Sequence, residues 1–273
     1  AYESITVIPT SILECAGDSL YLSLPMEMNR DYPESDSIRA AIPAFIDTVE
    51  GLEKLREDLF RRPLPHKLPR MVAVDSEWYF DDNSKEGTPE VRPKRVKHRS
   101  MSVATLQIAY VDENKTPLVL KSFVIDLLSN QPGFQTLAKE CVSWLFGSAS
   151  CDMTVLGFAF GGDLRQLRKY AGIGGYNKNH KEKSLEAVAS RCLDIQHLLA
   201  STEEIKTGSV PGLKKCAQLY FQKALKKDDQ TSDWRERPLR RSQLEYAALD
   251  AVILLVLLSQ KKQEDEKKQN SCT

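Results

Sequence analysis

The spacing of apolar residues changes along the chain and separates predicted helices from predicted strands. In VEGLEKLREDLF, apolar residues recur at helical spacing from Val49 to Leu59, and Thr48 stands where a helix N-cap would. The Pro-rich segment RRPLPHKLPR then ends that helix. MVAVDSEW at 71–78 is a short, Val-rich run bounded by proline and by the acidic DDNS turn, so it predicts a strand.

The remaining apolar runs complete a pattern in which strands come early and helices late. Two strands are predicted at 101–111 and 118–127, with DENKT as the turn between them. After them the pattern predicts a helix at 134–146, a strand in MTVLGFAF, a helix from about Asp163, a short apolar piece CLDIQHLLA, a helix after Pro211 and a helix at 240–259. No repeat of fixed period interrupts this order, which predicts an α/β fold with a mixed sheet flanked by helices.

Composition along the chain predicts three parts. Residues 1–43 mix short apolar runs with turn-formers and charges, which suits an N-terminal extension that packs on or near the principal domain. Residues 44–260 carry the periodic pattern and predict one domain, and the 41% hydrophobic content of the whole chain is ample for its core. The charged tail at 261–273 has no core-forming residues and is expected to be disordered.

Charge and cysteine content exclude several classes of protein. The 38 basic residues equal the 38 acidic ones, so no global field draws the chain to nucleic acid and such binding must come from local patches. The six cysteines are far apart and form no CxxC pair, which argues against a zinc site and a dense disulfide framework. An intracellular setting follows, with the cytoplasm favoured and the nucleus as the alternative.

The longest apolar run and the first residue bear on what surrounds the protein. AVILLVLL at 251–258 is far shorter than the roughly 20 residues that cross a bilayer, so it predicts a buried helix segment and no membrane partner. No Met stands first, which suggests a piece of a longer protein. Targeting signals and the sites for protein partners could then lie outside this sequence.

Four acidic residues and one tyrosine are the candidate chemical groups. Asp75 and Glu77 are two apart on a predicted strand and share one strand face, while Tyr246 and Asp250 are four apart on a predicted helix and share a helix face. Asp163 follows a strand-to-helix corner marked by two glycines. Hard divalent cations prefer carboxylate oxygens, and two such cations can stabilise the charge that builds during phosphodiester cleavage. The set therefore predicts a metal-dependent nuclease that binds two divalent cations, Mg²⁺ or Mn²⁺.

Each of these segments also has a plain structural interpretation. An Asp-x-Glu pair on a strand is common, and Asp163 alone could be a helix N-cap after the two glycines. Tyr246 and Asp250 alone could be a surface pair on an amphipathic helix. Only the conjunction of the three segments, in this order and with these flanking residues, favours the catalytic interpretation.

That conjunction resembles the DEDDy branch of the 3′–5′ exonucleases, which includes RNase D, the Werner exonuclease domain and the Nibbler-type RNA-trimming enzymes. Its three motifs correspond to VDSEW, GFAFGGDLRQL and YAALD, and the resemblance covers roughly residues 44–260. The sister DEDDh branch would need His five residues before Asp250, where Glu245 stands. The resemblance implies an RNase H-like fold whose central strand carries Asp75 and Glu77.

The resemblance also implies a role for each residue. Asp75, Glu77 and Asp250 would hold the nucleophile-side metal, and Asp75 together with Asp163 the leaving-group-side metal. Tyr246 would position the attacking water, since at its ordinary pKa of about 10 it suits hydrogen bonding better than general-base catalysis. The implied products are nucleoside 5′-monophosphates released from a 3′ end.

Several residues outside the motifs are candidates for contacting nucleic acid. Trp78, directly after the second carboxylate, could lie near the terminal nucleotide or be a half-buried strand-end residue. A basic run could follow the phosphate backbone, or be a solvated loop or a nuclear localisation patch; it comprises Arg92, Lys94, Arg95, Lys97 and Arg99. Arg235 and Arg237 precede the helix of Tyr246 and are a second candidate contact.

The substrate is then single-stranded or 3′-overhanging nucleic acid with a free 3′ end. RNA, with 3′-end trimming of small RNAs, is favoured because the closing segment DWRERPLRRSQLEYAALDA looks most like the Nibbler-type enzymes. Two alternatives stay open: a DNA-directed, Werner-like exonuclease, and a catalytically silent module that binds nucleic acid or a protein.

Overall fold

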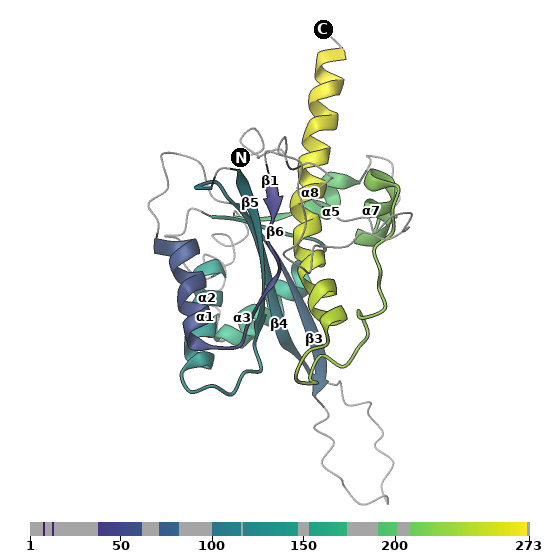
Figure 1. Ribbon diagram of the computed structural model, residues 1–273. Coiled ribbons are helices and arrows are strands. Elements are labelled where there is room, and N and C mark those ends of the chain that lie inside the picture. Colours follow the sequence, from purple (N-terminus) through teal and green to yellow (C-terminus); the bar gives the residue numbers. More distant parts are fainter. Residues whose placement is uncertain are drawn as a thin grey trace, which may run out of the picture.

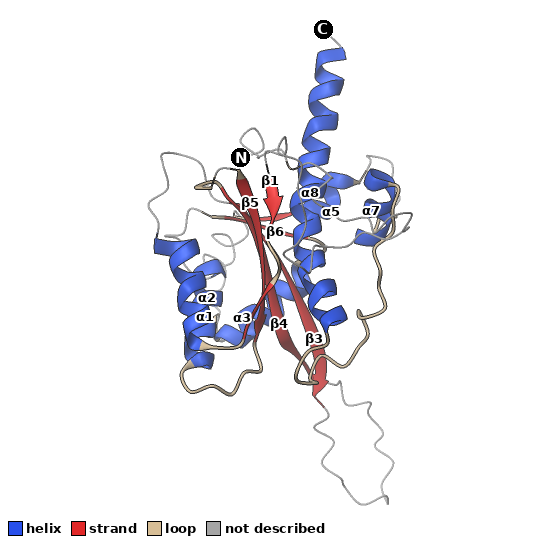
Figure 2. Ribbon diagram, in the orientation of Figure 1, coloured by secondary structure: helices blue, strands red, loops and turns tan. Residues whose placement is uncertain are grey.

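A mixed β-sheet with helices on both faces forms the centre of the molecule (Figures 1 and 2). The computed structural model describes Ile8, Leu13 and residues 38–61, 71–81, 100–115, 117–146, 153–173, 191–200 and 208–271. The architecture within these ranges is the α/β fold with a mixed sheet that the sequence predicts.

The sheet has seven strands among the described residues, in the order β1-β5-β4-β3-β6-β7, and β2 also pairs with β5. The strands are β1 (Ile38–Ala40), β2 (Ala44–Ile46), β3 (Met71–Asp81), β4 (Ser100–Asp112), β5 (Leu118–Asp126), β6 (Thr154–Gly157) and β7 (Cys192–Asp194). Neighbours β3, β4 and β5 are antiparallel, while β6 pairs parallel to β3 and to β7. The predicted strands at 71–78, 101–111 and 118–127 are thus confirmed, the first with three further residues.

Strand β3 runs well past the end of its neighbour β6. The two pair only from Met71 to Ala73, whereas β3 continues to Asp81 alongside β4. The later part of β3 therefore has one edge that no described strand covers. Side chains from both faces of the sheet can meet at this edge, which decides where a site can form.

The helices divide between the two faces of the sheet (Figure 1). On one face lie α1 (Val49–Arg56), a π-helical turn (Glu57–Arg61), α2 (Phe134–Phe146) and α3 (Gly161–Ala171); on the other lie α5 (Ile195–Leu199), α7 (Leu213–Phe221) and α8 (Arg241–Ser271). Each face buries its own apolar cluster against the sheet. The predicted helix at 134–146 matches α2 at both ends.

Helix α1 begins as its sequence predicts. The side chain of Thr48 accepts a hydrogen bond of 3.1 Å from the backbone N–H of Gly51, which satisfies one of the free donors of the first turn. Leu52 and Leu55 are buried on the face that packs against the sheet.

Helix α8 is the central helix of its face and is buried on nearly every side from Tyr246 to Ser259. By length and composition it could also cross a membrane, but 83% of its apolar window is buried inside the fold, as in a core helix. The predicted disordered tail differs from the structure, because α8 continues through Ser271 beyond the body of the domain (Figure 1). Lys261 pairs with Asp265 one turn on, at 2.6 Å, which supports this exposed part.

The described residues of the predicted N-terminal extension contact the domain. Ile8 and Leu13 are buried in the cluster around α8, and the backbone N–H of Ile8 donates to Oγ of Ser259 at 2.7 Å. Strand β1 adds to the sheet by pairing in parallel with β5.

Candidate active site

Strand β3 presents different side chains to the two faces of the sheet. Ala73 packs in the cluster under α8, and Trp78 packs in the cluster under α2 and α3. Because side chains alternate along a strand, Asp75 and Glu77 project to the α8 face and Ser76 to the α3 face. All lie on the part of β3 whose edge extends beyond β6, so both sets can line one cavity.

Helix α8 brings its own acidic residue to Asp75 and Glu77. Asp250 is 4% exposed, and one carboxylate oxygen from each of the three residues lies within 4.8 Å of the others. Tyr246 lies one turn earlier on the same helix face and is also buried. The predicted pairs on β3 and α8 are thus adjacent in space, and Tyr246 and Asp250 are not a surface pair.

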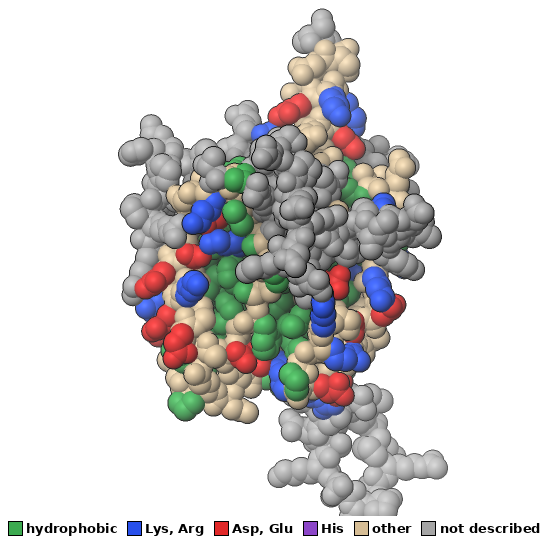
Figure 3. Space-filling view, in the orientation of Figure 1, with side chains coloured by type: hydrophobic (Ala, Val, Ile, Leu, Met, Phe, Trp, Pro, Cys, Tyr) green, Lys and Arg blue, Asp and Glu red, His purple; other side chains and the backbone are tan. Residues whose placement is uncertain are grey.

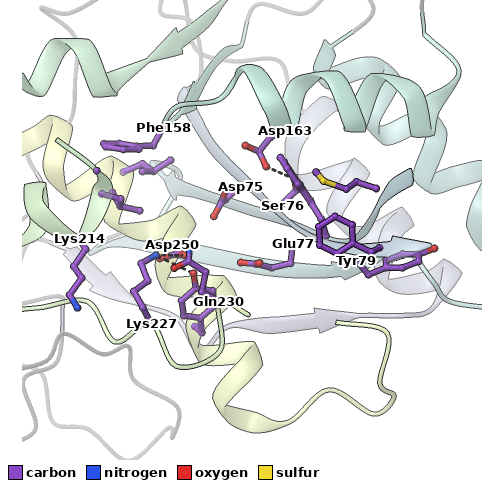
Figure 4. A pocket seen from close by; sticks show the side chains of 17 residues that line it. Asp75, Ser76, Glu77, Tyr79, Phe158, Asp163, Lys214, Lys227, Gln230 and Asp250 are labelled. Carbon is purple, nitrogen blue, oxygen red and sulfur yellow. Dashed lines mark hydrogen bonds and ion pairs between the residues drawn. The ribbon is translucent and has the colours of Figure 1, made fainter. Parts of the chain in front are cut away.

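Asp163 reaches the cavity from the other face of the sheet. It lies in the first turn of α3, whose N-cap position is held by Phe160, so Asp163 is not the N-cap. The β6–α3 corner is fixed by Asp194, whose carboxylate accepts from the backbone N–H groups of Ala159 and Phe160 at 3.0 and 2.9 Å. Figure 4 shows Asp75 projecting between Asp163 and Asp250.

A chain of hydrogen bonds holds Asp163 in place. The Ser76 hydroxyl donates to Oδ1 of Asp163 at 2.6 Å, and Nε1 of Trp78 donates to the Ser76 oxygen at 2.7 Å (Figure 4). The Trp78 ring also packs against α3 at Gly162, where an added Cβ would come within 2.9 Å of the ring. Gly162 is therefore needed for the close approach of α3 to β3.

The clustered carboxylates resist ionisation in the absence of a cation. Burial, followed by the charges of Asp250 and Asp163, raises the pKa of Asp75 well above its usual value. Burial and the neighbouring Asp75 do the same to the pKa of Glu77, and burial raises the pKa of Asp163 to about 6. A divalent cation would offset this repulsion, and oxygen ligands suit Mg²⁺ and Mn²⁺. The residues present fit such a metal.

Lys227 supplies positive charge within the cluster. Its Nζ lies 3.0 and 3.1 Å from the two carboxylate oxygens of Asp250 and 3.1 Å from the hydroxyl of Tyr246 (Figure 4). Burial raises the pKa of Asp250, and the ammonium of Lys227 opposes that rise. Lys227 is not among the residues predicted from the sequence, although it lies in the loop before α8. The feature of the sequence that could have indicated Lys227 is its position in the segment that leads to Tyr246.

These residues line one open cavity of about 730 Å³. Its walls combine the acidic cluster with Trp78, Phe80 and Met101 from the β3–β4 end of the sheet, and with two lysines, Lys214 and Lys227. Elsewhere the visible face mixes Lys and Arg with Asp and Glu, without a large area of one sign (Figure 3). Among the described residues, Lys214 and Lys227 place positive charge beside the carboxylates, where it can attract a polyanion.

Known proteins similar to this chain identify the family to which it belongs. A family profile described as 3′–5′ exonuclease matches residues 44–262, which is most of the chain. The chain belongs to this family. A related exonuclease, the exonuclease mut-7 homolog of Aedes aegypti, is 33% identical over 221 residues, covering 77% of this chain and 25% of the relative. The chain thus spans about a quarter of that relative's length.

Solved structures of exonucleases share the fold. The Aedes aegypti Nibbler EXO domain matches with a TM-score of 0.57 at 22% identity, over 83% of this chain and 90% of that chain. Escherichia coli RNase D, an exoribonuclease involved in structured RNA processing, matches with a TM-score of 0.50 at 19% identity, over 84% of this chain and 46% of that chain. The predicted RNase H-like fold of the DEDD exonucleases is confirmed.

The predicted nucleic-acid contacts of this exonuclease domain have different surroundings. Trp78 lines the cavity beside the carboxylates. Arg237 is bound to Asp126 through two hydrogen bonds of 2.6 and 2.8 Å, and Arg235 is paired with Asp233 at 2.9 Å. Neither arginine lines the cavity, and their contact with nucleic acid stays a prediction. The basic run lies outside the described residues: Arg92, Lys94, Arg95, Lys97 and Arg99.

Proposed function

We propose that this exonuclease domain shortens single-stranded RNA from its 3′ end by hydrolysis, using two divalent cations, Mg²⁺ or Mn²⁺. The observation that carries the proposal is the meeting of four carboxylates and Tyr246 at the open edge of β3, inside one cavity. An exonuclease needs a cavity open enough for a strand to enter, with anionic groups concentrated where its last phosphate lies.

The carboxylates divide into two sets for holding cations. Asp75, Glu77 and Asp250 are close enough to share one cation, and Asp163 lies across Asp75 from them, so Asp75 and Asp163 would hold the other. When bound, such cations would neutralise charge on the phosphate and lower the pKa of the attacking water.

The residues of the chain would bind the strand, orient the attacking water and offset the negative charge. The hydroxyl of Tyr246 faces the cluster and orients the water, because burial and the neighbouring carboxylates raise its pKa and keep it protonated. The water oxygen bonds to the last phosphorus as the bond from that phosphorus to the 3′ oxygen of the preceding nucleotide breaks. The water loses a proton and the 3′ oxygen gains one, giving a nucleoside 5′-monophosphate and a strand one nucleotide shorter.

RNA is the favoured strand, and trimming of small-RNA 3′ ends is the favoured task. The support comes from similar proteins: the closing segment resembles Nibbler-type enzymes, and the fold matches that of RNase D, an exoribonuclease.

The direct test uses RNA and DNA strands labelled at either end, incubated with the protein and Mn²⁺ or Mg²⁺. We expect 5′-labelled RNA to shorten one nucleotide at a time, and 3′-labelled RNA to release labelled mononucleotide at once. EDTA should stop both. Internal cuts, or turnover that survives EDTA, would overturn the proposal, and faster loss of DNA would favour the Werner-like alternative.

A pair of variants separates an enzyme from a silent binding module. Asp75→Asn keeps the side-chain shape but removes a charge that both cations would need, so we expect activity to fall by at least about 10³-fold. Glu266→Gln is the matched control, because Glu266 is 54% exposed in the distal part of α8. A binding module would keep its function in both variants.

A further inference from the structure

One end of the active-site cavity exposes an aromatic residue that the catalytic cluster does not use. Phe80, near the end of β3, is 52% exposed, and it lines the same cavity as the carboxylates. Its cross-strand partner on β4 is Met101, which lines that cavity as well. We call Phe80 and Met101 the ledge.

The ledge differs from its neighbour Trp78 in how it is held. Trp78 is fixed, because its indole N–H is bonded to Ser76 and its ring packs against Gly162. The Phe80 ring, two residues on along the same face of β3, leaves about half of its surface to water beside the cavity. Burying apolar surface away from water is stabilising, and this part of the ring is not buried. A ligand that covers the exposed surface of the ring would therefore gain binding free energy.

The position of the ledge indicates which part of a strand would cover it. Two residues of β-strand span about 7 Å, so Phe80 lies farther from the carboxylates than Trp78 does. The phosphate at the carboxylates joins the terminal nucleotide to the upstream strand, so these two parts lie on opposite sides of the carboxylates. The upstream strand is the part that must leave the cavity, and the half-exposed Phe80 lies where the cavity opens to water. The upstream bases would therefore run along β3 past Trp78 toward Phe80.

We propose that the ledge is a subsite for an unpaired nucleobase upstream of the terminal nucleotide. The base would stack on the face of Phe80, and the thioether of Met101 would pack against it. All four bases have an aromatic face, so the subsite would accept any of them. This inference rests on the proposed function, since it assumes a strand whose 3′ end lies at the carboxylates.

The position of the ledge disfavours ligands other than a nucleic-acid strand. Its two side chains are part of the wall of the cavity that holds the carboxylates and two lysines, so the ledge is continuous with a site for a phosphate chain. Bases inside a duplex would not serve, because each is paired and stacked between its neighbours and offers no free face to Phe80. The subsite therefore favours single strands.

The test measures strand affinity in EDTA, where hydrolysis is absent, with 5′-fluorescein RNA and fluorescence anisotropy. We expect Phe80→Ala to raise Kd about tenfold, the effect of losing one stacked base, and Phe80→Trp to keep the affinity. Phe80→Leu keeps an apolar surface without an aromatic face and should resemble Phe80→Ala. Leu219→Ala is the matched control, because Leu219 is 54% exposed on α7 and does not line the cavity.

Abasic strands locate the base. A single abasic sugar at the second, third or fourth position from the 3′ end should weaken binding to the unaltered protein at one of these positions. At that position it should have little further effect on Phe80→Ala. The inference is overturned if Phe80→Ala binds like Leu219→Ala, or if the abasic penalty is the same with and without the ring.

Failure of the subsite and failure of the proposed function give different results. A strand that binds in a Phe80-dependent way but is not degraded with Mn²⁺ would overturn the function and leave the subsite. A strand that is degraded alike by Phe80→Ala and Leu219→Ala, with equal Kd, would overturn the subsite and leave the function.

Discussion

The Ser76 hydroxyl donates a hydrogen bond of 2.6 Å to Oδ1 of Asp163, joining β3 to α3 across 87 residues of sequence. Both residues are buried, so this bond fixes the direction of the carboxylate. We expect Ser76→Ala to weaken binding of the cation proposed at Asp163 about tenfold, because groups that orient metal ligands typically contribute that much. Calorimetric titration with Mn²⁺ measures this directly, apart from activity.

Two further variants control for the loss of a buried serine. Ser76→Thr keeps the hydroxyl and should restore most of the Mn²⁺ affinity. Ser122→Ala removes a buried hydroxyl on β5, outside the cavity, and should leave Mn²⁺ binding unchanged. Equal Mn²⁺ titrations for Ser76→Ala and the unaltered protein would show that the bond does not position the ligand.

Asp163 should make the metal-free protein less stable as pH rises. Its folded pKa is raised by burial to about 6, from an ordinary value of 3.8. Below that ordinary value the carboxyl is neutral in both states. Between the two values the folded state holds the proton more tightly, so the free energy of unfolding falls as pH rises. The full penalty, at most about 3 kcal/mol, is present above pH 6.

Asp163→Asn removes this penalty and keeps an oxygen for Ser76. In EDTA the variant should gain stability relative to the unaltered protein as pH rises from about 4 to 6, measured by urea unfolding at several pH values. With Mn²⁺ at pH 7 the order should reverse, because the variant lacks a carboxylate that the proposed cation would need. A stability difference that does not change with pH would show that Asp163 titrates normally.

Lys227 should stabilise the metal-free protein through Asp250. Their ion pair measures 3.0 Å, and the Asp250 side chain is 5% exposed, so removing the ammonium leaves a buried charge without its partner. We expect Lys227→Met to lower the free energy of unfolding in EDTA by about 1–3 kcal/mol. The next-door control is Lys226→Met, since Lys226 pairs with exposed Asp228 and should cost less than about 0.5 kcal/mol. Equal losses in the two variants would contradict this role.

Tyr246 should act as a neutral hydrogen-bonding group throughout the working pH range. Burial, Asp250 and Glu77 all raise its pKa, so no loss of activity from its ionisation is expected up to pH 10. Tyr246→Phe should lower kcat about 10²-fold through misplacement of the water, with a smaller change in KM. Tyr220→Phe, on α7, is the control. An alkaline limb near pH 10 that vanishes in Tyr246→Phe would contradict the neutral role.

The sequence predicts the backbone of the site better than its interactions. Local spacing is enough to place Asp75 and Glu77 on one face of a strand and Tyr246 with Asp250 on one face of a helix. The bonds from Ser76 to Asp163 and from Lys227 to Asp250 join residues on separate elements, so they depend on how those elements pack. The extension of α8 to Ser271 was missed because a polar segment can be helical without a core, supported by pairs along its surface.

Arg237 tests whether a predicted substrate contact is instead structural. Its guanidinium binds both oxygens of Asp126, whose side chain is 6% exposed, and its Nη1 donates to the carbonyl of Trp234 at 2.8 Å. Arg237→Ala would leave a buried carboxylate without its partner, so we expect the free energy of unfolding to fall by about 2–4 kcal/mol. Arg235→Ala breaks an exposed pair and should change it by less than about 0.5 kcal/mol. Well below its melting temperature, Arg237→Ala should bind RNA within about twofold of the unaltered protein, because this arginine lies outside the cavity wall. Unchanged stability with a large loss of RNA affinity would instead assign Arg237 to the substrate.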